Sequence, residues 1–502
     1  MDIRKYFEHW GIRVNPFQAE EAKNDEVYLG NLAETMTHPD FDKVIGSMRE
    51  VSTSVVFGKK GSGKTAMRLL MENRYKDHNV QHPEERIRVI RYDDLNPVID
   101  RLMRREPPRA SSKSVPDSLP KLRLVDHQDT ILSIGVSELV DEILADSSRE
   151  STRKVHSMPR RSRFDLALLA ALYDEPARGD GSSRLARLRR LTKVSPFWRP
   201  GRLLALVALS LIGLGAASIA YGLSPEEGVV WMLAIPSAML LIASLAAFIG
   251  AIFKRDRIGR RLHREMRTCL RTACEWRKVL GFFGGRDLLF SPLPRAGDQE
   301  SRYELTQRFQ RVLENWGYRK VVVIIDRVDE PQFVNSDPRK MRELIWPMLN
   351  NKFLQQEAFA LKFLLPSELG DQLQREDPEF FKEARLDKQN LIRRLEWTGA
   401  TLYDVCTRRL KASQDPAAQA EKLTSLSDLF DDDVSSTDLI NALDHMKQPR
   451  DAFKLLYQVI HEHCLDHPDD APVFQIPALV LNKVRKHQTT RLEDLEKGIS
   501  PG

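Results

Sequence analysis

The eight residues Gly58–Thr65 constrain the fold of this chain most, because they read G-x-x-x-x-G-K-T. The residues 52–57 before them read as a buried strand of β-branched and apolar character, and good helix formers follow over 66–71. A strand, a glycine-rich turn and a helix in this order let several backbone N–H groups surround one anion. The pattern therefore predicts a P-loop, in which Lys64 reaches the β- and γ-phosphates of a nucleotide and Thr65 binds Mg²⁺. The predicted nucleotide-binding residues of this loop are Gly58, Lys59, Lys60, Gly61, Ser62, Gly63, Lys64 and Thr65.

A P-loop needs an acidic residue at the end of a neighbouring strand to complete its metal site. Val321–Ile325 is an unbroken β-branched run, which favours a central strand of a parallel sheet that is buried on both faces. Asp326 follows at the carboxyl edge, where α/β sheets bind ligands, and we predict that it binds Mg²⁺ together with Thr65. Either Glu330 or Asp329 is then expected to orient the attacking water as a catalytic base, with Glu330 the preferred residue.

About 260 residues separate Thr65 from Asp326, and this interval contains two long segments without a charged side chain. The segments 203–223 and 229–253 are each long enough to cross a hydrocarbon core about 30 Å thick. Only five residues connect them, so the sequence predicts a transmembrane helical hairpin, with a buried soluble helix pair as the alternative. Lysines and arginines flank the pair, whereas the connection carries two glutamates. The positive-inside rule then places both termini in the cytoplasm.

Arginine dominates residues 150–200, and a further basic helical segment follows the second apolar segment. Three interpretations compete for these cations: binding to anionic lipid headgroups, binding to nucleic acid, and a solvated helical face. The adjacent apolar segments favour lipid. Nucleic acid stays open as a partner but is not favoured.

Bulk properties add few constraints. The chain has 502 residues, a formal net charge of +6 and four cysteines without C-x-x-C spacing. This usage indicates reduced thiols rather than a disulfide framework. The first residues are charged and lack an apolar run, so we expect no signal peptide.

These motifs, in this order, resemble the KAP family of P-loop NTPases, whose membrane spans lie between the two nucleotide motifs. The segments 58–65, 203–253 and 321–330 carry the resemblance. KAP proteins usually show D-D-L-D after the strand, whereas this chain has Asp326-Arg327-Val328-Asp329-Glu330, which is also similar to the D-x-h-D-E pattern of STAND signalling ATPases. The departure leaves open which acid is the base.

The resemblance implies a cytoplasmic ATPase of the additional-strand class that binds and hydrolyses Mg-ATP at the bacterial inner membrane. It implies a switch or assembly role, in defence or signalling, with a homo-oligomer or a protein partner. Arg450, at the start of the expected lid helix, would contact bound nucleotide. By analogy with AAA+-type ATPases, Ser367 would be a polar sensor near the γ-phosphate, and Arg393 or Arg394 would act as an arginine finger in trans. A turn serine and solvated arginines are the alternatives for these last three residues.

The expected fold class is α/β: a P-loop NTPase with a parallel sheet flanked by helices, an inserted two-helix transmembrane hairpin and a C-terminal helical lid. The expected domains are residues 1–145 and 281–412 for the NTPase core, 146–280 for the insertion and 413–502 for the lid. Two other functions remain open. One is a nucleotide-gated scaffold with little hydrolysis, and the other is a nucleic-acid-binding AAA+-type ATPase.

Overall fold

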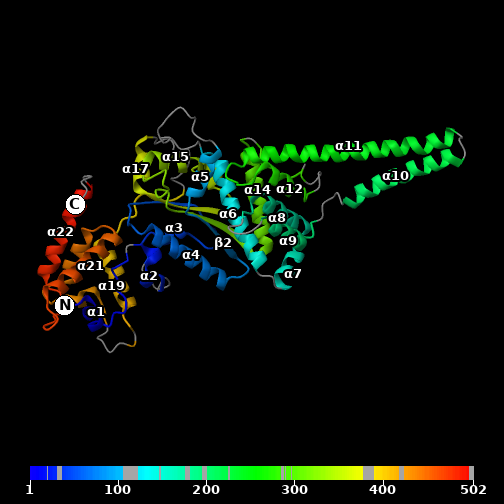
Figure 1. Cartoon of the computed structure of the whole chain (residues 1–502). Coiled ribbons are helices and arrows are strands. Elements are labelled where there is room, and N and C mark those ends of the chain that lie inside the picture. Colours follow the sequence, from blue (N-terminus) through cyan, green and yellow to red (C-terminus); the bar gives the residue numbers. More distant parts are fainter. Residues whose placement is uncertain are drawn as a thin grey trace. The chain divides into compact units, whose positions relative to one another are not determined.

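The structure is a computed structural model, and its chain forms two compact units, which are described separately (Figure 1). The core unit comprises Met1–Asp94 and Lys320–Gly502, and the helical unit comprises Leu95–Arg319. The residues that the structure describes are 1–19, 21–30, 37–105, 122–145, 149–175, 181–194, 200–223, 227–283, 288, 290–295, 297–376, 389–415, 417 and 423–496.

A five-stranded parallel sheet forms the centre of the core unit, which confirms the predicted α/β class. Strands β1 and β4 are neighbours inside this sheet. Every residue of both strands is buried, as expected for central strands of a parallel sheet. Val55 of β1 lies opposite Phe363 of β4, which in turn lies opposite Ile325 of β3. The strands are β1 (Ser54–Gly58), β2 (Arg86–Tyr92), β3 (Tyr318–Ile325), β4 (Phe359–Pro366) and β5 (Asn390–Ile392), in the spatial order β2-β3-β4-β1-β5.

Helices cover both faces of this sheet. On one face, α3 (Phe41–Ile45) and α4 (Lys64–Gln81) share an apolar cluster with Val56 of β1 and Leu364 of β4. Side chains alternate between the faces of a strand, so Phe57 points the other way, toward α17 (Ser367–Glu376). A Cβ atom on Gly370 of α17 would lie only 2.9 Å from the Phe57 ring. Shorter elements of the core unit are η1 (Ala22–Asn24), α2 (Glu26–Gly30), α15 (Pro338–Ile345), η2 (Trp346–Met348) and α16 (Asn351–Leu354).

Both ends of the chain build a helical body within the core unit. Tyr6 and Trp10, near the N-terminus, are buried in the same apolar cluster as Leu402 and Leu455 near the C-terminus. The N-terminal helix therefore packs with the predicted lid (Figure 1). The helices of this body are α1 (Ile3–His9), α19 (Gly399–Ser413), η4 (Leu426–Leu429), α20 (Ser436–Asp444), α21 (Pro449–Asp466) and α22 (Ala478–Glu496).

The described part of the helical unit consists of helices and their connections, apart from Tyr318 and Arg319, which begin β3. Its elements are α5 (Asn96–Arg105), α6 (Leu124–Ala145), α7 (Arg149–Ser157), α8 (Arg160–Tyr173), α9 (Gly181–Thr192), α10 (Pro200–Leu223), α11 (Glu227–Glu265), α12 (Ala273–Leu280) and α14 (Gln299–Trp316). Because α6 and α8 both pack against α14, they belong to one body with it. The compact units thus divide the chain after residues 94 and 319, whereas composition suggested boundaries after 145, 280 and 412.

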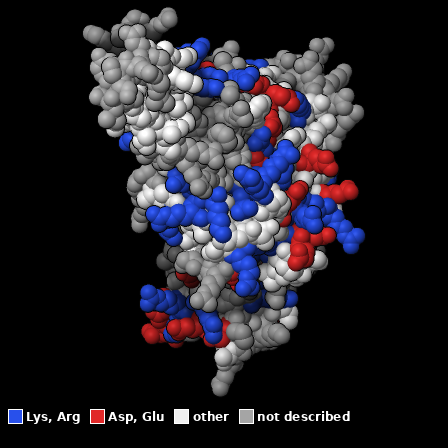
Figure 2. Space-filling model, turned by 90° about the vertical axis from the view of Figure 1, so that its right-hand side faces the viewer, with Lys and Arg blue, Asp and Glu red and all other residues white. Residues whose placement is uncertain are grey.

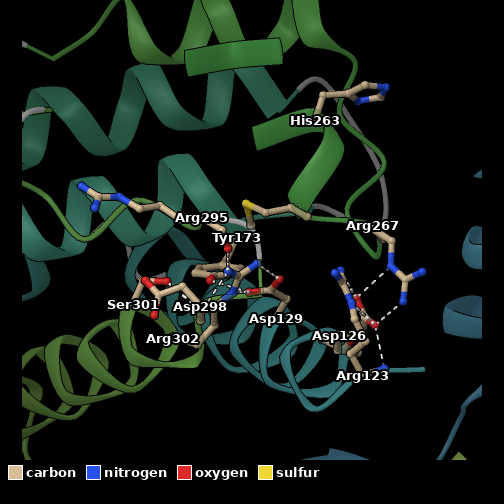
Figure 3. Close-up of polar contacts among 12 residues, drawn as sticks. Arg123, Asp126, Asp129, Tyr173, His263, Arg267, Arg295, Asp298, Ser301 and Arg302 are labelled. Atoms are coloured by element: carbon tan, nitrogen blue, oxygen red, sulfur yellow. Dashed lines mark hydrogen bonds and ion pairs between the residues drawn. The ribbon is translucent and has the colours of Figure 1, made fainter. Parts of the chain in front are cut away.

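A buried polar network holds the helical unit together (Figure 3). Asp129 of α6 accepts hydrogen bonds from Arg302 Nη2 at 3.0 Å and from the Tyr173 hydroxyl at 2.8 Å. One turn earlier, Asp126 accepts from Arg267 Nε at 3.2 Å and from the Arg123 backbone N–H at 2.9 Å. Removing one partner of a buried pair of this kind costs about 3–5 kcal/mol, so the network fixes α6 against α14 and against the segment after α11.

Many arginines of the basic segments form ion pairs or hydrogen bonds inside the protein. Arg184 of α9 pairs with Asp174 at 3.0 Å, and Arg271 donates to the backbone oxygen of the same aspartate at 2.5 Å. Together with Arg267, these side chains bind protein groups rather than an external polyanion. Exposed cations remain on α8, α9, α11 and α12, and they include Arg160, Arg161, Arg190, Arg257, Arg260, Arg264, Arg277 and Lys278.

Helices α10 and α11 pack side by side, and Gly213 of α10 lies directly against Ser237 of α11 (Figure 1). In the described residues one helix is long and apolar enough to cross a membrane, the Ala234–Glu265 part of α11, and little of it is buried. The apolar part of α10, Ala205–Ile219, is shorter than a span. The structure therefore supports one candidate span where the sequence predicted two, and the connecting residues 224–226 lie outside the described residues.

Candidate functional site

The P-loop lies at the carboxyl edge of β1, where 59–63 turn back into α4. Gly61 has a φ of 98° and Gly63 a φ of 94°, and this left-handed backbone favours glycine. A Cβ atom on Gly61 would also lie 2.9 Å from Gln448 Oε1, so the turn leaves no room for a side chain there. The backbone carbonyl of Ser62 accepts a hydrogen bond from Trp397 Nε1 at 2.8 Å. The two glycines are thus required by the conformation of the loop.

Lys64 is the first residue of α4, and its ammonium group is held inside the curve of the loop. Its Nζ donates to the carbonyl oxygens of Gly58 at 2.6 Å and of Lys59 at 3.1 Å. Burial lowers the pKa of Lys64, and the carboxylates of Asp329 and Asp326 act in the opposite direction because they stabilise the ammonium form.

Thr65 and Asp326 meet although 261 positions separate them in the sequence. Thr65 Oγ1 donates to Asp326 Oδ2 at 3.3 Å, and the Arg327 backbone N–H donates to Asp326 Oδ1 at 2.9 Å. Burial raises the pKa of Asp326, and the nearby Arg68 guanidinium opposes that shift. The contact forms because β1 and β3 run parallel, with β4 between them, so that their carboxyl ends reach the same edge of the sheet.

This pair of oxygen donors fits magnesium. Mg²⁺ is a hard cation that proteins usually hold through one or two carboxylates, with water and substrate phosphates as the remaining ligands. Among the described residues, no group of three or more His, Cys, Asp or Glu side chains could hold a metal ion by itself. The Thr65 hydroxyl and the Asp326 carboxylate therefore suit an ion that brings phosphate ligands with it.

Two further acids follow Asp326 in a tight turn. The Glu330 side chain is 56% exposed and lies 3.4 Å from the Arg327 guanidinium, while Asp329 is half-buried. Burial raises the pKa of Glu330, Arg327 lowers it, and Asp329 raises it further. Arg327 itself has a φ of 59°, which is uncommon for a non-glycine residue, and such strain concentrates at functional sites.

A pocket of about 720 Å³ opens at this edge of the sheet and is lined by the loop, by the acidic turn and by the helical body. Its volume lies in the ordinary range of small-molecule sites. Arg450, at the start of α21, lines the pocket, and its backbone N–H donates to the Gly61 carbonyl oxygen at 3.5 Å. The apolar lining includes Tyr28, Phe41, Met67, Leu70, Leu395 and Phe453. The structure thus gathers Lys60, Gly61, Gly63, Lys64, Thr65, Asp326, Asp329, Glu330 and Arg450 around one cavity.

Three residues that the AAA+ analogy singled out lie outside the lining of this pocket. Ser367 begins α17, and its hydroxyl donates to the Glu368 carboxylate at 3.2 Å. Arg393 and Arg394 are exposed, and Arg394 lies 3.7 Å from Asp371. None of the three lines the described pocket.

Sequence reasoning missed two residues of this site. Arg68 lies one turn after Lys64, and its Nε is 3.2 Å from Asp326 Oδ2. Trp397 contacts the P-loop through Ser62, and its ring meets His38 edge-on with centroids 4.8 Å apart. The i, i+4 spacing of Arg68 from Lys64 is a signal that could have placed the arginine on the same helix face. No local pattern marks Trp397, because the sheet brings it to the loop.

Comparison with known proteins gives no match for this chain among protein-family models, curated proteins or solved structures.

Proposed function

We propose that this chain is a membrane-attached P-loop ATPase that binds and hydrolyses Mg-ATP. One observation carries the proposal: Thr65 at the P-loop and Asp326 at the end of β3 lie in contact at 3.3 Å, on the wall of one 720 Å³ pocket. A glycine-rich loop, a lysine and a threonine–carboxylate pair are the parts from which phosphate and metal sites are built in P-loop NTPases.

Each residue then has a defined role. The loop amides and Lys64 bind the phosphates, and Thr65 and Asp326 hold the metal, whose charge neutralises the phosphate oxygens. Glu330, with Asp329 as the second candidate, accepts the proton of the attacking water or orients it. Arg450 lines the same pocket from the helical body and would contact bound nucleotide.

The order of the sheet supports the additional-strand class of P-loop ATPases. In the order β2-β3-β4-β1-β5, strand β4 lies between the P-loop strand and the strand that ends at Asp326. The resemblance to KAP and STAND proteins adds a switch or assembly role in bacterial defence or signalling, with a homo-oligomer or a protein as partner.

Replacing Glu330 by glutamine is expected to lower ATP turnover about a hundredfold while leaving nucleotide binding intact, because the amide cannot accept a proton. Asp329→Asn should cause a smaller loss. Since burial raises the pKa of Glu330, acidification should reduce wild-type turnover at a higher pH than it would with an ordinary glutamate. Steady-state turnover of the detergent-purified chain across a pH series measures both effects. A larger loss of turnover in Asp329→Asn than in Glu330→Gln would instead assign the catalytic base to Asp329.

Helix α11, together with α10, is proposed to anchor the protein in the inner membrane as a two-span hairpin with both termini in the cytoplasm. Large apolar side chains of α11 are exposed, including Met239, Ile242 and Leu245, whereas soluble proteins rarely expose a continuous apolar surface of this length. Exposed cations of α11 and α12 follow the apolar stretch. Figure 2 shows Lys and Arg side chains gathered across the middle of one face, with charges suited to anionic lipid headgroups.

A protease-cleavable tag inserted in 224–226 tests this topology. We expect the tag to be cut from outside in intact spheroplasts while tags at both termini stay protected. The protein should also resist extraction from membranes at alkaline pH. Exposure of one terminus would mean that α11 is a single span. Protection of all the tags would mean that the chain does not cross the membrane. Release by high salt alone would indicate a peripheral protein, and binding to nucleic acid that weakens steeply with salt would favour the nucleic-acid ATPase.

The second candidate is a nucleotide-gated scaffold with little hydrolysis. The ion pair between Glu330 and Arg327 is the observation that favours it, because this contact draws the proposed base away from a water nucleophile. In that case the wild type would bind ATP tightly without turnover, and Glu330→Gln would change nothing.

A further inference from the structure

The neighbourhood of Asp326 contains a buried cation that the proposed reaction does not use. The Arg68 side chain is 7% exposed, and that of Asp326 is 2% exposed. Arg68 Nε lies 3.2 Å from Asp326 Oδ2, and Arg68 Nη1 donates to Asp93 at 2.9 Å and to Glu72 at 3.1 Å. One guanidinium thus faces three carboxylates beside the P-loop.

The two sides of the Arg68 guanidinium are held differently. Nη1 makes two charge-assisted hydrogen bonds, to Asp93 and to Glu72. Nε is buried and has no hydrogen-bond partner among the described residues, so its contact with Asp326 is electrostatic only. Arg68 Nε can therefore move away from Asp326 without breaking a hydrogen bond, while Nη1 stays bound to Asp93 and Glu72.

The oxygen that Arg68 contacts is the one that a metal ion would need. Asp326 Oδ1 already accepts the Arg327 backbone N–H, whereas Oδ2 faces the Thr65 hydroxyl at 3.3 Å. A cation bound between Thr65 and Asp326 would meet the same Oδ2 that Arg68 occupies. Two cations cannot both use it at close range without strong repulsion.

We propose that Arg68 is a positioning residue that contacts the metal-facing oxygen of Asp326 and yields it to Mg²⁺ when the nucleotide binds. The inference rests on the proposed Mg-ATP site, and it adds that magnesium must compete with a guanidinium of the same chain. Asp93 is the second anchor that Arg68 keeps after release, so it favours the released state.

The test is the magnesium concentration that gives half-maximal binding of a fluorescent, non-hydrolysable ATP analogue to the detergent-solubilised full chain. Arg68→Met should lower this midpoint by about tenfold, because the competing charge is gone. Asp93→Asn should raise it several-fold, because Arg68 loses the charge of one of its two anchors and pairs more fully with Asp326. Arg74→Met removes an exposed charge from the same helix, α4, and it should change the midpoint less than twofold.

Each outcome decides the question. A midpoint that stays within twofold of wild type in both Arg68→Met and Asp93→Asn would overturn the competition, and a raised midpoint in Arg68→Met would mean that Arg68 assists the metal. If Arg68→Met fails to fold, the direction of the Asp93→Asn shift still supports or contradicts the proposal. A wild-type chain that binds no nucleotide at any magnesium concentration would instead contradict the proposed function, which is a separate result.

Discussion

Replacing Lys64 by alanine is expected to abolish measurable ATP turnover, with a loss of about a thousandfold or more, and to weaken ATP binding. The reason is the position of the ammonium group, which lies inside the P-loop and donates to the carbonyl oxygens of Gly58 and Lys59. When phosphate binds, these hydrogen bonds can be exchanged for charge-assisted bonds to phosphate oxygens. Fixed cations aimed at developing charge are among the largest contributions to phosphoryl transfer.

Turnover and equilibrium binding, measured side by side on detergent-purified protein, check this expectation. Lys76→Ala is the matched control, because Lys76 lies on the same helix, is exposed and does not line the described pocket. Its turnover should equal that of the wild type. Undiminished turnover in Lys64→Ala would show that the loop is not the phosphate site. Binding that is lost in Lys64→Ala, with no turnover in any form of the protein, would favour the nucleotide-gated scaffold.

Replacing Lys362 by methionine is expected to destabilise the core unit by about 3 kcal/mol or more, because buried carbonyl groups lose their donor. Lys362 lies in the central strand β4 and is 0% exposed. Its Nζ donates to the carbonyl oxygens of Val44 at 2.7 Å, Ile45 at 3.0 Å and Ser52 at 2.6 Å. Two of these carbonyls belong to the last turn of α3, so the ammonium group caps that helix and ties it to the sheet.

The same residue predicts how stability depends on pH. Burial lowers the pKa of Lys362 to about 7, whereas an unfolded lysine keeps its proton up to about pH 10. Between these values the unfolded state binds more protons, so the free energy of unfolding should rise with pH, by at most about 1.4 kcal/mol per pH unit. The three carbonyl acceptors stabilise the ammonium form and act against this slope.

Thermal unfolding of the full chain between pH 7 and pH 10 measures both effects. Lys362→Met should lower the midpoint by several degrees at pH 7 and remove the rise toward pH 10. Lys320→Met is the control, because Lys320 also donates to backbone carbonyls, those of Met48 and Arg49, but is only half-buried. An equal loss in both variants would mean that burial of Lys362 is unimportant, and an unchanged pH slope in Lys362→Met would assign the slope to other groups.

Local sequence patterns were sufficient for the parts of this protein that depend on neighbouring residues. The run 321–325 predicts a buried strand, and the glycines of 58–65 predict a turn that only glycine can adopt. Lys362 interrupts an otherwise apolar strand, which is a signal that its charge must be satisfied inside. The arginines of the basic segments gave a weaker signal, because an arginine that faces lipid and one that pairs with a buried aspartate look alike in sequence.

The sequence by itself determined the α/β class, the glycine-rich turn between β1 and α4, and the acid that ends β3, because each follows from residue type and short-range spacing. Tertiary structure alone decided that α1 packs with the C-terminal helices and that Arg184 and Arg271 bind Asp174 inside the protein. It also decided that Arg68 contacts the Asp326 carboxylate. It also placed Trp397 against the P-loop. These contacts join residues that are distant in the chain or choose one partner among several of equal chemistry, and only the packing of the sheet and helices makes that choice.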